Sequence, residues 1–401
     1  MRVKCVESYR LSRGASVSVS EENISCYAKH RDMTPIRIYR ILKFFGRLSC
    51  TWPPEYNDSK LRRLANDLQF IFMMTNVIVL LVPLVCGVYQ NRHHVATTMK
   101  ALSELTALGD VLFNLILCRV QRDRLRELLV EVKNYAHKIE GDEKEVFHRS
   151  VNQYLPFCTF VGLSYLQTAI AFSFGPLVMS SILPADTWYP FPIEIFSIVY
   201  FLVYIQQVVA IIQTGMCITV DFMVAYLLSY LSARLQTLNV EFRRVGNRRH
   251  LHDCIKQHLD FIRFTGELRL AVRFIILKGI VTMAMAAIFG VFPIIENEPL
   301  PVISQFILMV IGGCLRLYVS AWPADDVREM SERIGWSSYA SPWIGSSREM
   351  QRTISIVVHR AHRPLVIAVH GVLPALTLKF YASFLSATLS YFMTLRAVLG
   401  N

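Results

Sequence analysis

The chain closes on residues 363–401, "RPLVIAVHGVLPALTLKFYASFLSATLSYFMTLRAVLGN". Residues 365–399 are almost wholly apolar, and this predicts a bilayer-crossing helix over residues 365–396. At 1.5 Å per residue, about 32 helical residues reach about 48 Å, which exceeds the ~30 Å hydrocarbon core of a bilayer. The segment therefore indicates a membrane protein.

Small and hydroxyl-bearing residues form a stripe along the second half of this helix. They recur at spacings of three or four residues, so they share one helix face. The stripe consists of Ser383, Ser386, Ser390, Thr394 and Ala397. Two interpretations are open, a seam where neighbouring helices pack closely and the wall of a water-lined path.

Apolar residues gather in long blocks throughout the chain. Of its 401 residues, 53% are hydrophobic and 18% are charged. Blocks of about 20 apolar residues are typical of transmembrane helices, whereas short alternating runs are typical of strands. The sequence therefore predicts an all-α polytopic membrane protein with seven transmembrane helices. The predicted spans are residues 68–89, 95–118, 151–175, 193–222, 271–292, 302–321 and 365–396.

Lysine and arginine orient these spans, because basic residues are retained on the cytoplasmic side. Residues 1–65 contain thirteen of them, whereas residues 176–192 and 291–300 contain none. We therefore expect a cytoplasmic N-terminus and, with seven spans, an extracellular C-terminus. The net charge of +12 then reflects topology and attraction to inner-leaflet lipid, and no nucleic-acid binding is expected.

One domain is expected after a short extension. Residues 1–32 are polar and are predicted to be a mobile cytoplasmic extension, and residues 33–401 form the seven-helix domain. A basic amphipathic helix after Met33 is expected to lie on the inner membrane surface. Three charged segments with helical periodicity predict a helical cytoplasmic anchor region. They are residues 226–245, 250–274 and 347–362.

Charged residues inside the spans should face protein and not lipid. Asp221 and Lys278 could pair across helices, although Lys278 could equally reach the inner interface. Glu104 and Asp110 of the second span are expected to face the interior of the helix bundle.

His250, Cys254 and His258 are four residues apart, so they share one helix face in a spacing that suits a soft metal. A polar helix beside the membrane produces such clusters readily, and we predict neither a metal nor another cofactor. No GxGxxG, P-loop, HExxH or GxSxG motif occurs in a plausible context, so no enzymatic activity is expected.

A ligand pocket is expected between the outer halves of the middle spans, which are rich in aromatic and hydroxyl side chains. A concave apolar pocket with a few hydroxyl groups suits a small organic molecule, although ordinary helix packing uses the same residue types. The predicted pocket residues are Leu102, Leu105, Thr106, Val161, Ser164, Tyr165, Thr168, Tyr200, Tyr204, Phe306 and Met309.

The chain resembles the insect odorant receptors. The text "HRPLVIAVHGVLPALTLKFYASFLSATLSYFMTLR" is similar to the closing signature of that family, with its Arg, Pro-Leu, Gly, Pro, Phe and final Ser-Tyr-Phe followed by Leu-Arg. Upstream, "SERIGWSSYASPWI" resembles the segment before the family's last cytoplasmic helix, and "RILKFFGRLSCTWPP" resembles its start. The resemblance begins near Met33 and runs to the end.

This resemblance implies a ligand-gated, non-selective cation channel of four subunits in the plasma membrane, expected in the dendrite of an olfactory sensory neuron. In that family one odorant-binding subunit usually assembles with three copies of the coreceptor Orco. Small volatile molecules bind among the second, third, fourth and sixth spans, and the last helix of each subunit lines the pore. The chain lacks Orco's long insertion between the fourth and fifth spans, so it resembles a tuning subunit. The family's hydrophobic gate position falls on Thr394.

Other classes of polytopic protein fit less well. A G-protein-coupled receptor would place the basic N-terminal region outside, and the chain lacks that class's Asp-Arg-Tyr and Asn-Pro-x-x-Tyr motifs. A secondary transporter would be expected to show internal repeats. A gustatory-type ligand-gated channel shares the same plan and is the main alternative, and the closing Ser-Tyr-Phe text favours the odorant class.

Overall fold

A computed structural model describes residues 33–401 except 57, 94, 178–181, 296–299, 370, 372, 374, 400 and 401. The unit considered below is Pro35–Asn401, and Met1–Thr34 form a separate unit. The mobile extension predicted at residues 1–32 lies outside the described residues.

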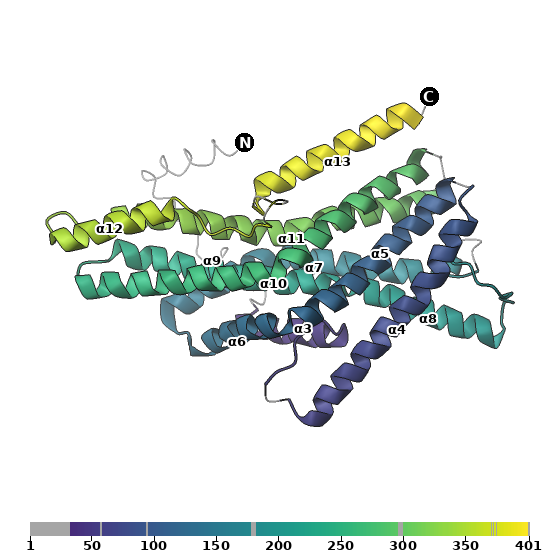
Figure 1. Cartoon of the computed structure of the whole chain (residues 1–401), viewed down its shortest axis with the longest axis horizontal. Coiled ribbons are helices and arrows are strands. Elements are labelled where there is room, and N and C mark those ends of the chain that lie inside the picture. Colours follow the sequence, from purple (N-terminus) through teal and green to yellow (C-terminus); the bar gives the residue numbers. More distant parts are fainter. Residues whose placement is uncertain are drawn as a thin grey trace, which may run out of the picture. The chain divides into compact units, whose positions relative to one another are not determined.

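The described residues fold into helices of very different lengths (Figure 1). They are α3 (Pro35–Leu48), α4 (Lys60–Gln90), α5 (Val95–Val120), α6 (Arg122–Lys138), α7 (Gly141–Ser173), the 3-10 turn η1 (Gly175–Leu177), α8 (Ile198–Gly215), α9 (Ile218–Arg243), α10 (Arg248–Ile295), α11 (Leu300–Tyr339), α12 (Arg348–Ala361) and α13 (Leu378–Leu399). Within the described ranges, pairing of the β type is limited to one bridge between Val369 and Leu373. The predicted all-α fold class is therefore confirmed.

The predicted spans correspond to the long helices. The first six fall on α4, α5, α7, α8 with α9, α10 and α11. Among the described residues, five helices are long and apolar enough to cross a bilayer. They are Lys60–Gln90, Thr97–Val120, Gly141–Ser173, Ile198–Arg243 and Arg248–Phe289. The chain thus has the helices of a multi-pass membrane protein, and the number of seven spans stays a prediction.

The fourth predicted span, 193–222, begins later than expected and is interrupted. Helix α8 starts after Ser197, whose hydroxyl oxygen accepts a hydrogen bond from the Tyr200 N–H (3.1 Å) and so caps the helix. The helix ends at Gly215, where a Cβ atom would lie only 3.0 Å from the Ala169 Cβ. A small residue is needed at this point, because α7 and α8 approach each other closely there.

The helix predicted at 365–396 begins only at Leu378, so that boundary was wrong. The sequence places Pro374 within the expected helix and Pro364 directly before it, and a proline has no N–H to donate. Gly371 has a φ of +79°, in the left-handed region that glycine tolerates. The chain reverses around it, and the Leu376 N–H donates to the Ile367 carbonyl (2.8 Å).

The apolar residues of this reversed segment are buried in the protein. They are Leu365, Ile367, Val369, Leu373 and Leu376. Their hydrophobicity therefore serves packing, whereas the following helix α13 has 22 residues and reaches about 33 Å, enough for a ~30 Å hydrocarbon core.

The predicted anchor region is a bundle built around α9. Most of α9 is buried, and polar contacts join it to the second half of α11. The Asn239 side-chain amide donates to the Met330 carbonyl (2.8 Å), and the Ser337 hydroxyl donates to the Asn239 side-chain oxygen (2.8 Å). Arg248 at the start of α10 pairs with Glu349 of α12 (2.6 Å). The predicted segments 226–245, 250–274 and 347–362 do form helices, and their cytoplasmic position stays a prediction.

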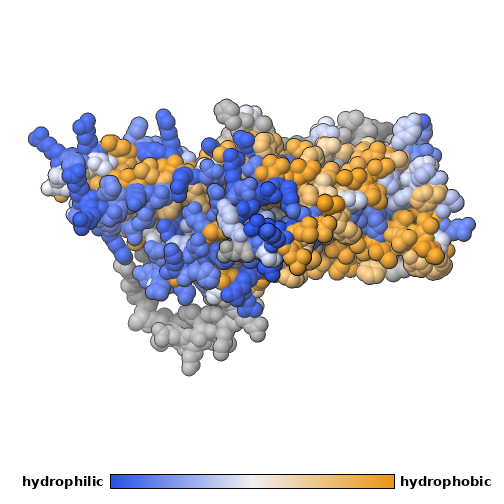
Figure 2. All heavy atoms as spheres, turned by 60° about the horizontal axis from the view of Figure 1, so that its bottom comes forward, coloured by the Kyte–Doolittle hydropathy of each residue, from blue (hydrophilic) through white to orange (hydrophobic). Residues whose placement is uncertain are grey.

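Surface polarity divides the unit into two parts. Figure 2 shows hydrophobic residues over the part that contains α4, α5 and α8, and mostly hydrophilic residues over the part that contains α6 and α12. Exposed side chains on α4 include Leu68, Ile71 and Phe72. A continuous exposed apolar surface of this kind is stable in lipid, because no aqueous solvent meets it.

Candidate functional site

A cavity of about 290 Å³ lies between the helices of the apolar part. Helices α4, α5, α7, α8, α10 and α11 contribute to its wall, together with Pro184 and Ala185 of the loop before α8. Its size and largely apolar lining suit a small organic molecule.

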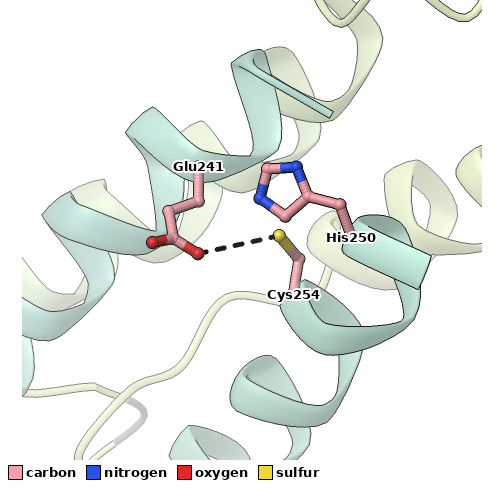
Figure 3. A group of neighbouring side chains, drawn as sticks. All are labelled: Glu241, His250 and Cys254. Carbon is pink, nitrogen blue, oxygen red and sulfur yellow. Dashed lines mark hydrogen bonds between the residues drawn. The ribbon is translucent and has the colours of Figure 1, made fainter. Parts of the chain in front are cut away.

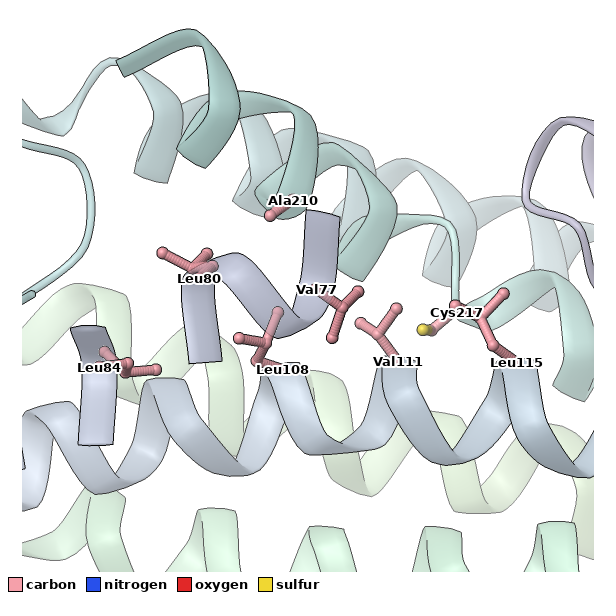
Figure 4. Packing of buried hydrophobic residues seen from close by; sticks show 8 residues of the cluster. All are labelled: Val77, Leu80, Leu84, Leu108, Val111, Leu115, Ala210 and Cys217. Atoms are coloured by element: carbon pink, nitrogen blue, oxygen red, sulfur yellow. The ribbon is translucent and has the colours of Figure 1, made fainter. Parts of the chain in front are cut away.

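One wall of the cavity is a cluster of aliphatic side chains (Figure 4). The cluster contains Val77, Leu80, Leu84, Leu108, Val111, Leu115, Ala210 and Cys217, which come from α4, α5, α8 and the α8–α9 junction. Three members of this cluster, Leu80, Leu84 and Leu108, also line the cavity. Interdigitated side chains of this kind hold their rotamers, so the wall is fixed before any ligand binds.

The loop of residues 184–188 contributes Pro184 and Ala185 to the cavity lining. The Ala185 N–H donates to the Gln207 side-chain oxygen (2.9 Å), and the Asp186 N–H donates to Glu104 Oε2 (2.9 Å). The loop also lies so close to α4 that a Cβ atom on Gly87 would sit 2.6 Å from the Asp186 carbonyl oxygen. The loop is thus held against three helices, α4, α5 and α8.

A network of buried charged side chains lies on another side of the cavity, where Asp110 and Arg316 belong to the lining. The Asp110 carboxylate of α5 contacts Lys278 Nζ of α10 (2.6 Å) and an Arg316 guanidinium nitrogen of α11 (2.7 Å). A second guanidinium nitrogen of Arg316 contacts Asp221 of α9 (2.6 Å). The exposed fractions of these four side chains are between 6% and 12%. Asn114 accepts a further hydrogen bond from Lys278 (2.9 Å).

These contacts revise the expected pairing. The prediction that Glu104 and Asp110 face the interior is confirmed, because both line the cavity. The Asp221–Lys278 pair was not the arrangement found: Asp221 pairs with Arg316, and Lys278 pairs with Asp110. The sequence signal for this pairing is Arg316, the single arginine within the sixth apolar block, 302–321.

Two buried polar atoms of residues that line the cavity have no hydrogen-bond partner among the described residues. They are the Nη2 atom of Arg316 and the Oε1 atom of Glu104, and neither has accessible surface toward the cavity. A buried donor or acceptor left unpaired costs about 1–3 kcal/mol.

Four of the predicted pocket residues, Thr106, Ser164, Tyr165 and Thr168, line the cavity. The three hydroxyl groups of Thr106, Ser164 and Thr168 donate to carbonyls one turn earlier in their own helices, at 2.8–2.9 Å. Their donor capacity is therefore used, and toward a ligand they offer oxygen lone pairs. Phe172 of α7 lines the same cavity.

Other predicted pocket residues lie elsewhere. Val161 packs in a separate cluster with Ile218 and Val319, and Leu105 packs behind the aliphatic wall. The carbonyl of Leu102, which is half-buried, accepts the Thr106 hydroxyl.

Tyr200 and Tyr204 precede Gln207, which holds the loop of residues 184–188, by seven and three residues. They therefore lie about 10 Å and about 5 Å further along α8, beyond the loop attachment. The Tyr204 hydroxyl donates to the Ser173 carbonyl (2.7 Å). The side chains of Phe306 and Met309 are outside the described residues.

Helix α13 presents its stripe away from the rest of the unit. The stripe residues Ser383, Ser386, Ser390, Thr394 and Ala397 are all exposed. On the other side of the helix, Phe384, Leu385 and Thr388 are partly buried. The chain thus partly buries Phe384, Leu385 and Thr388, whereas the stripe, and also Leu389 (63% exposed), stay available to lipid, water or another surface.

Comparisons with known proteins place this architecture in a family. The model of the family described as 7tm Odorant receptor matches residues 94–389. Odorant receptor 10 of Aedes albopictus is 30% identical over 147 residues, which are 36% of this chain and 38% of that protein. Odorant receptor Or2 of Anopheles gambiae is 28% identical over 151 residues, 37% of this chain and 39% of that protein. The alignments thus span less than two fifths of these two relatives.

The fold is also that of a solved structure. The insect olfactory receptor OR5 from Machilis hrabei superposes with a TM-score of 0.75 at 18% identity, over 90% of this chain and 98% of that one. The structure of the same receptor in complex with eugenol gives a TM-score of 0.74, over 91% of this chain. At this identity the likeness concerns the fold alone.

The charge network yields a test of what holds the cavity together. Arg316→Gln leaves Asp110 and Asp221 without their shared cation, and breaking a buried ion pair costs about 3–5 kcal/mol. We expect the melting temperature of the purified full-length chain to fall markedly. Arg333→Gln on the same helix is the matched control, because its pair with Glu329 is exposed and is worth at most about 1 kcal/mol. Equal melting temperatures for the two variants would contradict the role given to the network.

Proposed function

Because the chain belongs to the odorant receptor family, we propose that it is an odorant-binding subunit of a ligand-gated cation channel that detects small volatile molecules. The observation that carries the proposal is the largely apolar cavity of about 290 Å³ between α4, α5, α7, α8, α10 and α11. Family membership also supports a receptor over an enzyme, and it favours an odorant receptor over a gustatory-type channel or a G-protein-coupled receptor.

The cavity favours a ligand that is mostly apolar. Most of the wall is aliphatic or aromatic, which excludes strongly hydrated solutes by the cost of desolvation. The complex of OR5 from Machilis hrabei with eugenol supports a small organic ligand in a protein of this fold.

The channel activity is proposed to involve α13 and other subunits. A single chain cannot enclose a pore with one helix, so the exposed stripe needs equivalent helices from partners to form a polar lumen. In the arrangement that the family resemblance implies, one copy of this chain joins three copies of Orco in the plasma membrane of the dendrite. Thr394 then contributes one of four side chains at the gate.

The first test concerns the pocket. Ser164→Phe replaces a hydroxyl with a phenyl ring at a position that lines the cavity, and overfilling a packed site costs about 1–3 kcal/mol. We expect the half-maximal odorant concentration to rise on the order of tenfold in cells that also express Orco. Thr159→Phe, on an exposed face of the same helix, is the matched control and should leave the response series unchanged. If the half-maximal odorant concentrations are the same in Ser164→Phe as in the unsubstituted chain, Ser164 does not belong to the binding site.

The second test concerns the stripe. In the complex with Orco, a cysteine introduced as Ser390→Cys should react with a small water-soluble thiol reagent when odorant is applied, and the current should change as the modified side chain narrows the pore. Leu389→Cys, one residue away and directed toward lipid, should react more slowly, and the unsubstituted chain controls for native cysteines. Identical behaviour of both variants would assign the stripe to helix packing.

A further inference from the structure

The turn between α9 and α10 brings together three side chains of the metal-ligating types. Glu241 comes from the end of α9, and His250 and Cys254 come from the first two turns of α10 (Figure 3). One ligand atom of each residue lies within 4.8 Å of the others. The Cys254 Sγ–Glu241 Oε2 distance is 4.0 Å. The four-residue spacing in the sequence grouped His258 with His250 and Cys254. In the structure His258 packs edge-on against Phe242 instead, with ring centroids 6.4 Å apart.

The backbone around these residues is held by packing and capping. The Arg244 N–H donates to the Glu241 carbonyl (3.0 Å) at the end of α9, and the His250 N–H donates to the Asn247 side-chain oxygen (2.8 Å) at the start of α10. Val245 and Cys254 are fully buried. Both helix ends are thus fixed, so the three side chains meet without an entropic cost of closing the loop.

We propose that Glu241, His250 and Cys254 bind a zinc ion that joins the end of α9 to the start of α10. A thiolate, an imidazole and a carboxylate together match the borderline-soft character of Zn²⁺. Tetrahedral zinc with bonds of about 2.0–2.3 Å places its ligand atoms about 3.5 Å apart, so shifts of about 1 Å suffice. A water molecule takes the fourth position.

The charges of such a site balance. Binding displaces the thiol proton of Cys254 to solvent and uses neutral His250, so the Zn²⁺ charge is offset by one thiolate and one carboxylate. A neutral site is favourable in this turn, because Arg243, Arg244 and Arg249 are close in sequence and would repel an uncompensated cation.

The test is zinc binding by the purified full-length chain in a lipid nanodisc, followed by titration with a competing chelator and by metal analysis. We expect one tightly held zinc per chain, and an affinity at least about tenfold lower in Cys254→Ser, in His250→Ala and in Glu241→Gln. His252→Ala is the matched control, since His252 is exposed in the same turn, and it should bind zinc as the unsubstituted chain does.

A spectroscopic measurement separates a built site from loosely bound zinc. Co²⁺ in place of zinc should give a thiolate-to-cobalt charge-transfer band that disappears in Cys254→Ser. If Cys254→Ser loses its fold, judged by size-exclusion profile without added metal, the half-buried His250→Ala variant carries the test. Zinc affinity that is equal in the control and in the ligand variants would overturn the proposal.

Discussion

The carboxylate of Asp110, which holds two cations from two other helices, is the contact on which the cavity depends. Charges within an apolar bundle are costly, and they persist only when paired and hydrogen-bonded. Here Lys278 and Arg316 approach Asp110 at 2.6 and 2.7 Å, and Arg316 reaches on to Asp221. The network therefore joins α5, α9, α10 and α11 in one arrangement, and any shift of one helix separates a buried charge from its partner.

The same network shapes the proposed ligand chemistry. Two of the three guanidinium nitrogens of Arg316 are engaged by carboxylates, and Nη2 has no partner among the described residues. The aliphatic wall from α4 and α5 favours apolar molecules, whereas Asp110 and Arg316 form the charged part of the cavity lining.

Hydropathy predicted the helices well, because each apolar block is long enough for only one kind of structure in a bilayer. It failed at residues 365–376, where an apolar run is buried in protein and not in lipid. Composition alone does not distinguish these two environments, although Pro364 and Gly371 were signals of a break. The aromatic and hydroxyl content of the outer halves of the middle spans predicted Thr106, Ser164, Tyr165 and Thr168, which line the cavity. It could not predict that Arg316 meets Asp110, or that Tyr200 and Tyr204 lie outside the cavity lining, since both depend on which helices become neighbours.

The most direct measurement is an experimental structure of this chain in its channel complex with an activating odorant. The account predicts the odorant inside the cavity between α5, α7, α8 and α11, in contact with Ser164 and Tyr165. An odorant bound outside this cavity, beside Tyr200 and Tyr204, or with no contact to these four helices, would contradict it.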